Sequence, residues 1–196
     1  MALLCACTFA GAGGMSGDSA MAEEGVASAN EPVYNIPLRV HLGLSGRSAA
    51  DFRDILEDIN HIWLSQAGIC FEIEVVMNDD IVASGFDIWF MPEIEEYEDS
   101  NGNYAGRNDI KVRDLPLLKA SSTPSKHPAA RTAAHELGHG LGLPHRQDSD
   151  DNLMRSRTTG WQLNSDEIAL ARKTAAALAP GMRDGRECGP IRVEPR

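Results

Sequence analysis

The sequence of 196 residues is poor in basic residues and contains no run of them. Lys and Arg number 18 against 29 Asp and Glu, so the formal net charge at pH 7 is −11. Such a surface repels nucleic acids and anionic membranes, which excludes a nucleic-acid partner. No apolar stretch reaches the length of a membrane-spanning helix. The chain is long enough for one domain with a proper hydrophobic core, and we expect a monomer.

Cysteine is scarce as well, and two of the four, Cys5 and Cys7, lie in an N-terminal stretch that is apolar and rich in small residues. This stretch is typical of the apolar part of a secretory signal, although the basic residues that usually precede it are missing. Leu4-Cys5-Ala6-Cys7 resembles a bacterial lipobox, which would make Cys7 a lipidated first residue. Ala20-Met21-Ala22 instead fits a signal-peptidase site ahead of Glu23. The remaining alternative is a disordered cytoplasmic extension. We favour export, which predicts a secreted protein or a cell-surface or periplasmic lipoprotein.

Cys70 and Cys188 are the two cysteines outside this leader. In an oxidising compartment they could pair and fasten the C-terminal tail to the central sheet. They could equally be unrelated buried thiols, because connectivity cannot be read from sequence. Residues 15–32 are rich in Gly, Ser, Ala and Glu, which predicts a flexible tether. The predicted organisation is therefore a leader and tail over residues 1–32 and a folded domain over residues 33–196.

The spacing of apolar residues predicts an α+β domain. Alternating or continuous apolar runs predict strands over residues 34–42, 69–77, 86–91 and 109–115, with a short one near Tyr104. Helical spacing predicts three main helices, after the capping box at Ser48, after Pro128 and after Asn164. The order strand, helix, strand, strand indicates a β-α-β start to a twisted mixed sheet of about four or five strands. His41 falls on the polar side of the first strand and is expected to be solvated.

The segment His135-Glu136-Leu137-Gly138-His139 places two histidines four residues apart. On a helix they lie one turn apart on the same face, where two imidazoles can bind one metal ion. Glu136, beside the first histidine but turned away from it, suits a general base acting on a metal-activated water. Gly142 permits a backbone turn, because glycine accepts a positive φ, and His145 can then return as a third ligand. Three histidines and one open position indicate a catalytic zinc site rather than a structural one.

The run from His135 to His145 resembles the extended zinc motif of the metzincin metallopeptidases, of the matrixin-like bacterial type. Asp151-Asn152-Leu153-Met154 resembles the Met-turn that lies beneath the zinc in that clan. The resemblance is sharp over residues 131–156 and diffuse over residues 36–180. It implies a zincin fold with the active-site helix beneath the sheet. It also implies site roles: His135, His139 and His145 as metal ligands, Glu136 as the catalytic residue and Met154 as the structural floor.

The same resemblance implies two segments beside the substrate. An edge strand near Asn103–Gly106 would pair with an extended substrate by strand addition, and Arg155–Gly160 would form one wall of the pocket beside the scissile bond. Some metzincins carry a tyrosine two residues after the methionine. Ser156 stands at that position here, which leaves the fourth metal position to water alone.

Asp99, Asn101 and Asn103 begin like a calcium-binding loop. Tyr104 then replaces the glycine that such a loop requires, and Ile110 replaces its bidentate glutamate. We prefer a solvated turn in this segment and keep a Ca²⁺ site of less regular geometry as the weaker alternative.

These expectations together describe a zinc-dependent endopeptidase with Glu136 as general base and a protein or peptide as substrate. One alternative is a secreted binding or adhesin module in which zinc only stabilises the fold. Glu136 argues against it, because a purely structural zinc site has no use for that carboxylate. Another alternative is a zinc hydrolase that acts on a small amide, for which a deep closed pocket is expected instead of an open edge strand.

Overall fold

The structure is a computed structural model, and it describes residues 32–95, 99–116, 127–183 and 187–194. The predicted lipidation site at Cys7 and the predicted cleavage site at Ala20–Ala22 lie outside the described residues. Both therefore stay predictions.

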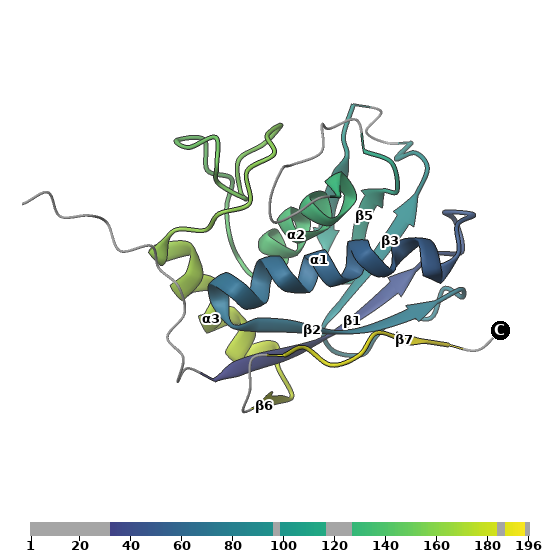
Figure 1. Cartoon of the computed structure of the whole chain (residues 1–196), viewed down its shortest axis with the longest axis horizontal. Coiled ribbons are helices and arrows are strands. Elements are labelled where there is room, and N and C mark those ends of the chain that lie inside the picture. The colour runs from purple at the N-terminus through teal and green to yellow at the C-terminus, as the bar shows by residue number, and fades with distance from the viewer. Residues whose placement is uncertain (1–31, 96–98, 117–126, 184–186, 195–196) are drawn as a thin grey trace, which may run out of the picture.

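One mixed sheet of seven strands, counted over the described residues, runs through the molecule (Figure 1). Its order is β4-β5-β3-β1-β2-β7, and β6 pairs with β1 off this path. Neighbouring strands along the order run parallel, except that the edge strand β4 is antiparallel to β5. The strands are β1 (Val33–His41), β2 (Ile69–Val76), β3 (Phe86–Met91), β4 (Gly102–Gly106), β5 (Asp109–Arg113), β6 (Gly181–Arg183) and β7 (Arg192–Val193).

Helix α1 (Ala49–Ala67) joins the parallel strands β1 and β2, which confirms the predicted β-α-β start. The backbone N–H of Ser48 donates to the Asp51 carboxylate at 2.9 Å, as expected of a capping box. The helix ends at Gly68, whose φ of 62° lies in the left-handed region that glycine adopts without penalty.

Two further helices complete the described fold. α2 (Pro128–Gly140) has proline in its first turn, where the missing N–H costs nothing. α3 (Ser165–Leu178) begins at Asn164, whose side chain accepts hydrogen bonds from the next turn. Across the described ranges, none of the helices combines the length and the apolarity that a membrane crossing demands.

Helices α1 and α2 pack together and cover one face of the sheet (Figure 1). Leu38 and Val40 of β1 share one buried cluster with Phe52 and Ile59 of α1 and with Leu137 of α2. Because side chains alternate along a strand, the odd-numbered residues of β1 point to the opposite face. The apolar periodicities of strand and helix therefore meet in a single core.

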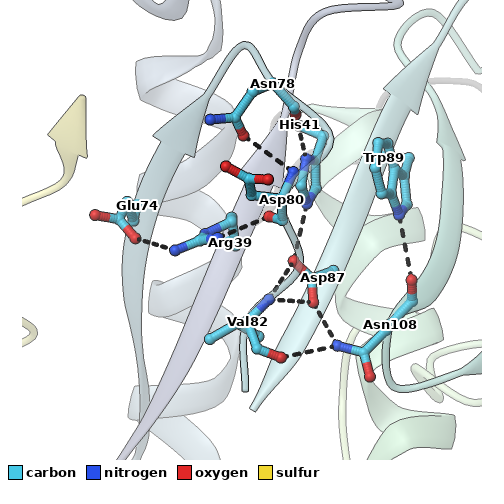
Figure 2. A network of polar contacts seen from close by, with 9 residues as sticks. All are labelled: Arg39, His41, Glu74, Asn78, Asp80, Val82, Asp87, Trp89 and Asn108. Carbon is cyan, nitrogen blue, oxygen red and sulfur yellow. Dashed lines mark hydrogen bonds and ion pairs between the residues drawn. The ribbon is translucent and has the colours of Figure 1, made fainter. Parts of the chain in front are cut away.

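On the opposite face, His41 belongs to a network of polar contacts and is buried (Figure 2). The expectation that His41 is solvated is therefore wrong. His41 is 2% exposed, stacks on Trp89 with ring centroids 3.7 Å apart, and contacts Asp87 at 2.8 Å. The backbone of Asn78 and Val82 reaches the same two polar residues. The segment between β2 and β3 thus covers this part of the sheet, which strand alternation alone could not reveal.

The sheet has seven described strands, more than the four or five predicted. The two additional strands lie in the C-terminal tail, for which the sequence predicts irregular structure. β6 pairs with the start of β1, and β7 pairs with β2. They are three and two residues long, too short to carry a periodic signal. A disulfide between Cys70 and Cys188 brings this tail to β2, which confirms the paired alternative over two separate thiols.

We predict that replacing both Cys70 and Cys188 with Ser lowers the free energy of unfolding by about 2–5 kcal/mol. The bridge spans a sequence separation of 118, so its loss greatly increases the entropy of the unfolded chain. Urea unfolding of the double variant and of the oxidised wild type measures the difference. Equal midpoints would contradict a stabilising bridge, and addition of a dithiol reductant should affect the wild type alone.

Candidate metal centre

Helix α2 lies close to its neighbours because its buried face consists of small residues. It packs against α1 and against β3, β4 and β5. The residues that allow this approach are Ala129, Ala130, Ala133 and Ala134, all of them buried. A backbone held so firmly gives its polar side chains a defined direction toward the cleft.

The three predicted ligands come together at the end of this helix. One nitrogen from each of His135, His139 and His145 can be chosen so that all lie within 4.8 Å of one another. Nε2 of His139 and Nε2 of His145 are 3.2 Å apart. The chain reverses after the helix at Gly142, whose φ is 88°, and this turn returns His145 to the other two. The site can therefore hold a metal ion.

Backbone carbonyls fix the tautomer of two of these ligands. Nδ1 of His135 lies 2.7 Å from the carbonyl oxygen of Leu153, and Nδ1 of His139 lies 2.8 Å from that of Leu143. A carbonyl oxygen only accepts, so each Nδ1 carries the proton. Each Nε2 then keeps a lone pair for the metal, the arrangement that usually supports a metal-bound histidine. Three neutral imidazoles suit zinc, as well as copper, iron and nickel.

Burial keeps the rings of His135 and His139 neutral. It lowers the pKa of His135 to about 3, and the charge of Arg131 lowers it further against the raising effect of the Leu153 hydrogen bond. Burial likewise lowers the pKa of His139. Ligands that are already deprotonated at neutral pH bind a cation without first losing a proton.

Glu136 is a buried carboxyl that opens onto the same cleft. Burial raises its pKa to about 7, while the charge of Arg131 acts in the opposite direction. Gly102 of β4 lies directly against it, since a Cβ at position 102 would stand 2.6 Å from Oε1 of Glu136. A carboxyl that can change protonation near neutral pH has the property required of a general base.

Met154 lies against the helix that carries the three histidines. It is fully buried, and a Cβ at Gly138 would stand 2.5 Å from its Sδ. The glycine between the two helical histidines is therefore what lets the methionine approach.

Arg131 is a residue at the site to which the sequence pattern assigned no role. Its Nη2 donates to the carbonyl oxygens of Leu153 and Arg155 at 2.7 Å each, and its Nε donates to that of Gly160 at 3.0 Å. Leu153 thus accepts from both Arg131 and His135. The only sequence signal was one charged residue inside a run of small ones, a helical turn before His135. This guanidinium ties the segment after the Met-turn to the ligand helix.

The three histidines open into a cleft of about 610 Å³. Residues of β4 line this cleft, together with Ser156 and Arg157. Arg157 has a φ of 61°, an unusual conformation for a residue with a side chain. Asp99, Asn101 and Asn103 also line this cleft.

A calcium site at that last segment stays a prediction. In the described parts of the chain, the three histidines are the only group of three or more His, Cys, Asp or Glu side chains placed to share a metal ion.

We predict that Gly138→Ala weakens metal binding by about tenfold, because the new methyl group forces Met154 away from the ligand helix. Inside a helix, alanine is otherwise more stable than glycine by about 1 kcal/mol. A lower free energy of unfolding in Gly138→Ala would therefore come from the clash with Met154. Competition with a chelator measures the affinity. Gly181→Ala is the matched control, since nothing lies within 4 Å of a Cβ there. Equal affinities in the two variants would rule out the proposed contact.

The metal-free protein should lose stability as the pH falls from about 6.5 to about 3. The pKa of His135 is lowered in the folded state from 6.5 to about 3, so the unfolded chain takes up the proton first. Its contribution is present above pH 6.5 and is lost as the pH falls through the folded value. Glu136 affects stability in the opposite direction, because its pKa in the folded state is about 7 and its ordinary pKa is 4.5. Its contribution is present below pH 4.5 and is lost as the pH rises through 7.

Urea unfolding of the metal-free protein over this pH range separates the two groups. His135→Gln should flatten the loss in acid, and Glu136→Gln should flatten the loss between pH 4.5 and 7. A His135→Gln profile with the wild-type slope below pH 6.5 would assign the acid sensitivity to other groups.

No protein-family model and no curated protein sequence matches this chain. The chemistry of the site is therefore inferred from its own geometry. That geometry consists of three imidazoles placed to share a cation, one buried carboxyl beside them, and an open cleft bordered by an edge strand.

Proposed function

We propose that this protein is an exported zinc-dependent endopeptidase of the metzincin type. The observation that carries the proposal is Glu136, a buried carboxyl with a pKa raised to about 7, in the cleft that the three histidines share. A site that used a metal only to hold the fold would gain nothing from that carboxyl and would need no cleft. The helix, the turn at Gly142 and Met154 beneath the ligands are the features that favour the metzincin type.

His135, His139 and His145 are the residues that would hold the zinc. When bound there, zinc supplies a Lewis acid that polarises a peptide carbonyl and makes water more acidic. Glu136 accepts the proton of the attacking water and returns it to the leaving amine. Arg131 and Leu153 hold the His135 ring in one orientation through the contacts already described.

The edge strand β4 gives the cleft a way to bind an extended peptide. β4 is the last strand of the sheet on its side, and β5 is its only partner among the described strands. Its free edge offers backbone N–H and C=O groups to a substrate strand. Gly102, Asn103 and Tyr104 of this strand line the cleft. An edge strand beside the ligands favours a peptide over the small amide considered as an alternative substrate.

The test is cleavage of a broad peptide library by the zinc-loaded protein and by its Glu136→Gln variant. We expect the variant to bind zinc and to lose about 10²- to 10⁴-fold in kcat, because the proton acceptor is gone. Metal content by mass spectrometry shows whether zinc stays in place. Glu57→Gln, on the exposed face of α1, is the matched control and should keep full activity.

Two outcomes would reject the proposal. Undiminished cleavage by zinc-loaded Glu136→Gln would remove the assigned base. The absence of any cleavage by a wild type that holds one zinc per chain would instead favour the binding module. Export is tested separately by sequencing the N-terminus of the mature protein.

A further inference from the structure

The buried pair of His41 and Asp87 on the far face of the sheet has no part in the proposed chemistry. Both side chains are at most 2% exposed, and they lie 2.8 Å apart (Figure 2). We propose that this hydrogen-bonded pair acts as a lock that positions the edge strand β4 along the metal cleft. The inference rests on the proposed function in one respect: the position of β4 affects activity only if a substrate binds along this strand.

Both ring nitrogens of His41 contact an oxygen atom. Nδ1 lies 2.9 Å from the carbonyl oxygen of Asn78, which can only accept, so Nδ1 carries a proton. Nε2 faces Oδ1 of Asp87, and the two oxygens of that carboxyl group also accept from the backbone N–H of Val82. The two side chains thus satisfy each other's polar atoms away from water.

Charged groups from four elements surround the pair. Arg39, two residues earlier on β1, donates to Glu74 at 3.2 Å and to the carbonyl of Asp80 at 2.7 Å. Lys111 of β5 is the register partner of Trp89 on the neighbouring strand, and its Nζ lies 3.9 Å from Oδ1 of Asp109. Asp79 and Asp80 are exposed in the covering segment. Asp87 is the carboxyl group that contacts the ring of His41 in the described part of the chain.

The lock reaches β4 through the turn that joins β4 to β5. Nδ2 of Asn108 donates to Oδ2 of Asp87 and to the carbonyl of Val82 (Figure 2). The carbonyl of Asn108 accepts from Nε1 of Trp89 at 3.4 Å, and the carbonyl of Arg107 accepts from the backbone N–H of Asp87 at 2.8 Å. Both residues of this turn are therefore held by the two β3 residues that contact His41.

The other end of β4 is at the metal centre. Gly102 lies against Glu136, and the ring of Tyr104 is 6.3 Å from that of His139. β4 has neighbours on one side only, so its position depends on β5, on α2 and on the turn at residues 107 and 108. Loss of either side chain would leave a polar atom of the other buried without this hydrogen bond. The loosening of Asp87 would extend to Asn108 and to the turn.

The experiment compares His41→Gln and Asn108→Ala with His61→Gln, a matched control at an exposed position of α1. Asn108→Ala leaves the His41–Asp87 pair intact and cuts only its link to the turn. Amide hydrogen exchange over residues 102–108 is measured in the zinc-loaded proteins. We expect exchange about tenfold faster in both test variants and unchanged in the control, the effect of losing one well-placed hydrogen bond.

A second readout separates positioning from simple stability. With a peptide cleaved by the wild type, KM should rise about fivefold in both variants while kcat stays within about twofold, because binding along β4 weakens and Glu136 is untouched. Unchanged exchange in Asn108→Ala would overturn the lock. The exchange measurement needs no turnover, so it decides the lock even if the peptidase proposal fails.

Discussion

The carbonyl oxygen of Leu153 is the point on which the metal centre depends. It accepts from Nδ1 of His135 and from Nη2 of Arg131, both of which extend from α2. The first contact leaves Nε2 of His135 free to bind a cation, and the second fixes the carbonyl itself. Because Leu153 immediately precedes Met154, the same contacts hold the floor of the site under the helix. One backbone carbonyl thus orients the ring of His135 and holds the segment around Met154 against α2.

Close packing against glycine extends this arrangement to the rest of the site. Gly138 lets Met154 touch α2, and Gly102 lets β4 touch Glu136. In both places a methyl group would occupy space that the side chain of Met154 or Glu136 fills. The close approach of β4 contributes to the burial of the Glu136 carboxyl, and burial raises its pKa.

The two faces of the sheet serve the site in different ways. One face packs its aliphatic residues against α1 and α2, and this burial fixes the height of the ligand helix above the strands. The other face holds the His41–Asp87 pair, whose partners reach the turn at the end of β4. An edge strand has a neighbour on one side only, so polar contacts at its turn supply part of the restraint that a second strand would give.

The sequence determined the elements and the ligand set. The spacing of His135, His139 and His145, with Gly142 between the last two, predicts one shared site, because helical periodicity and a glycine turn are local properties. Strand and helix periods likewise predicted β1, α1, α2 and α3 close to their observed bounds. Only the tertiary structure decided that Arg131 clamps the cleft wall, that His41 is buried and that the tail adds β6 and β7. These features join residues far apart in the chain through single polar contacts or very short pairings. Such contacts leave no periodic signal in the sequence, and their geometry exists only once the core has packed.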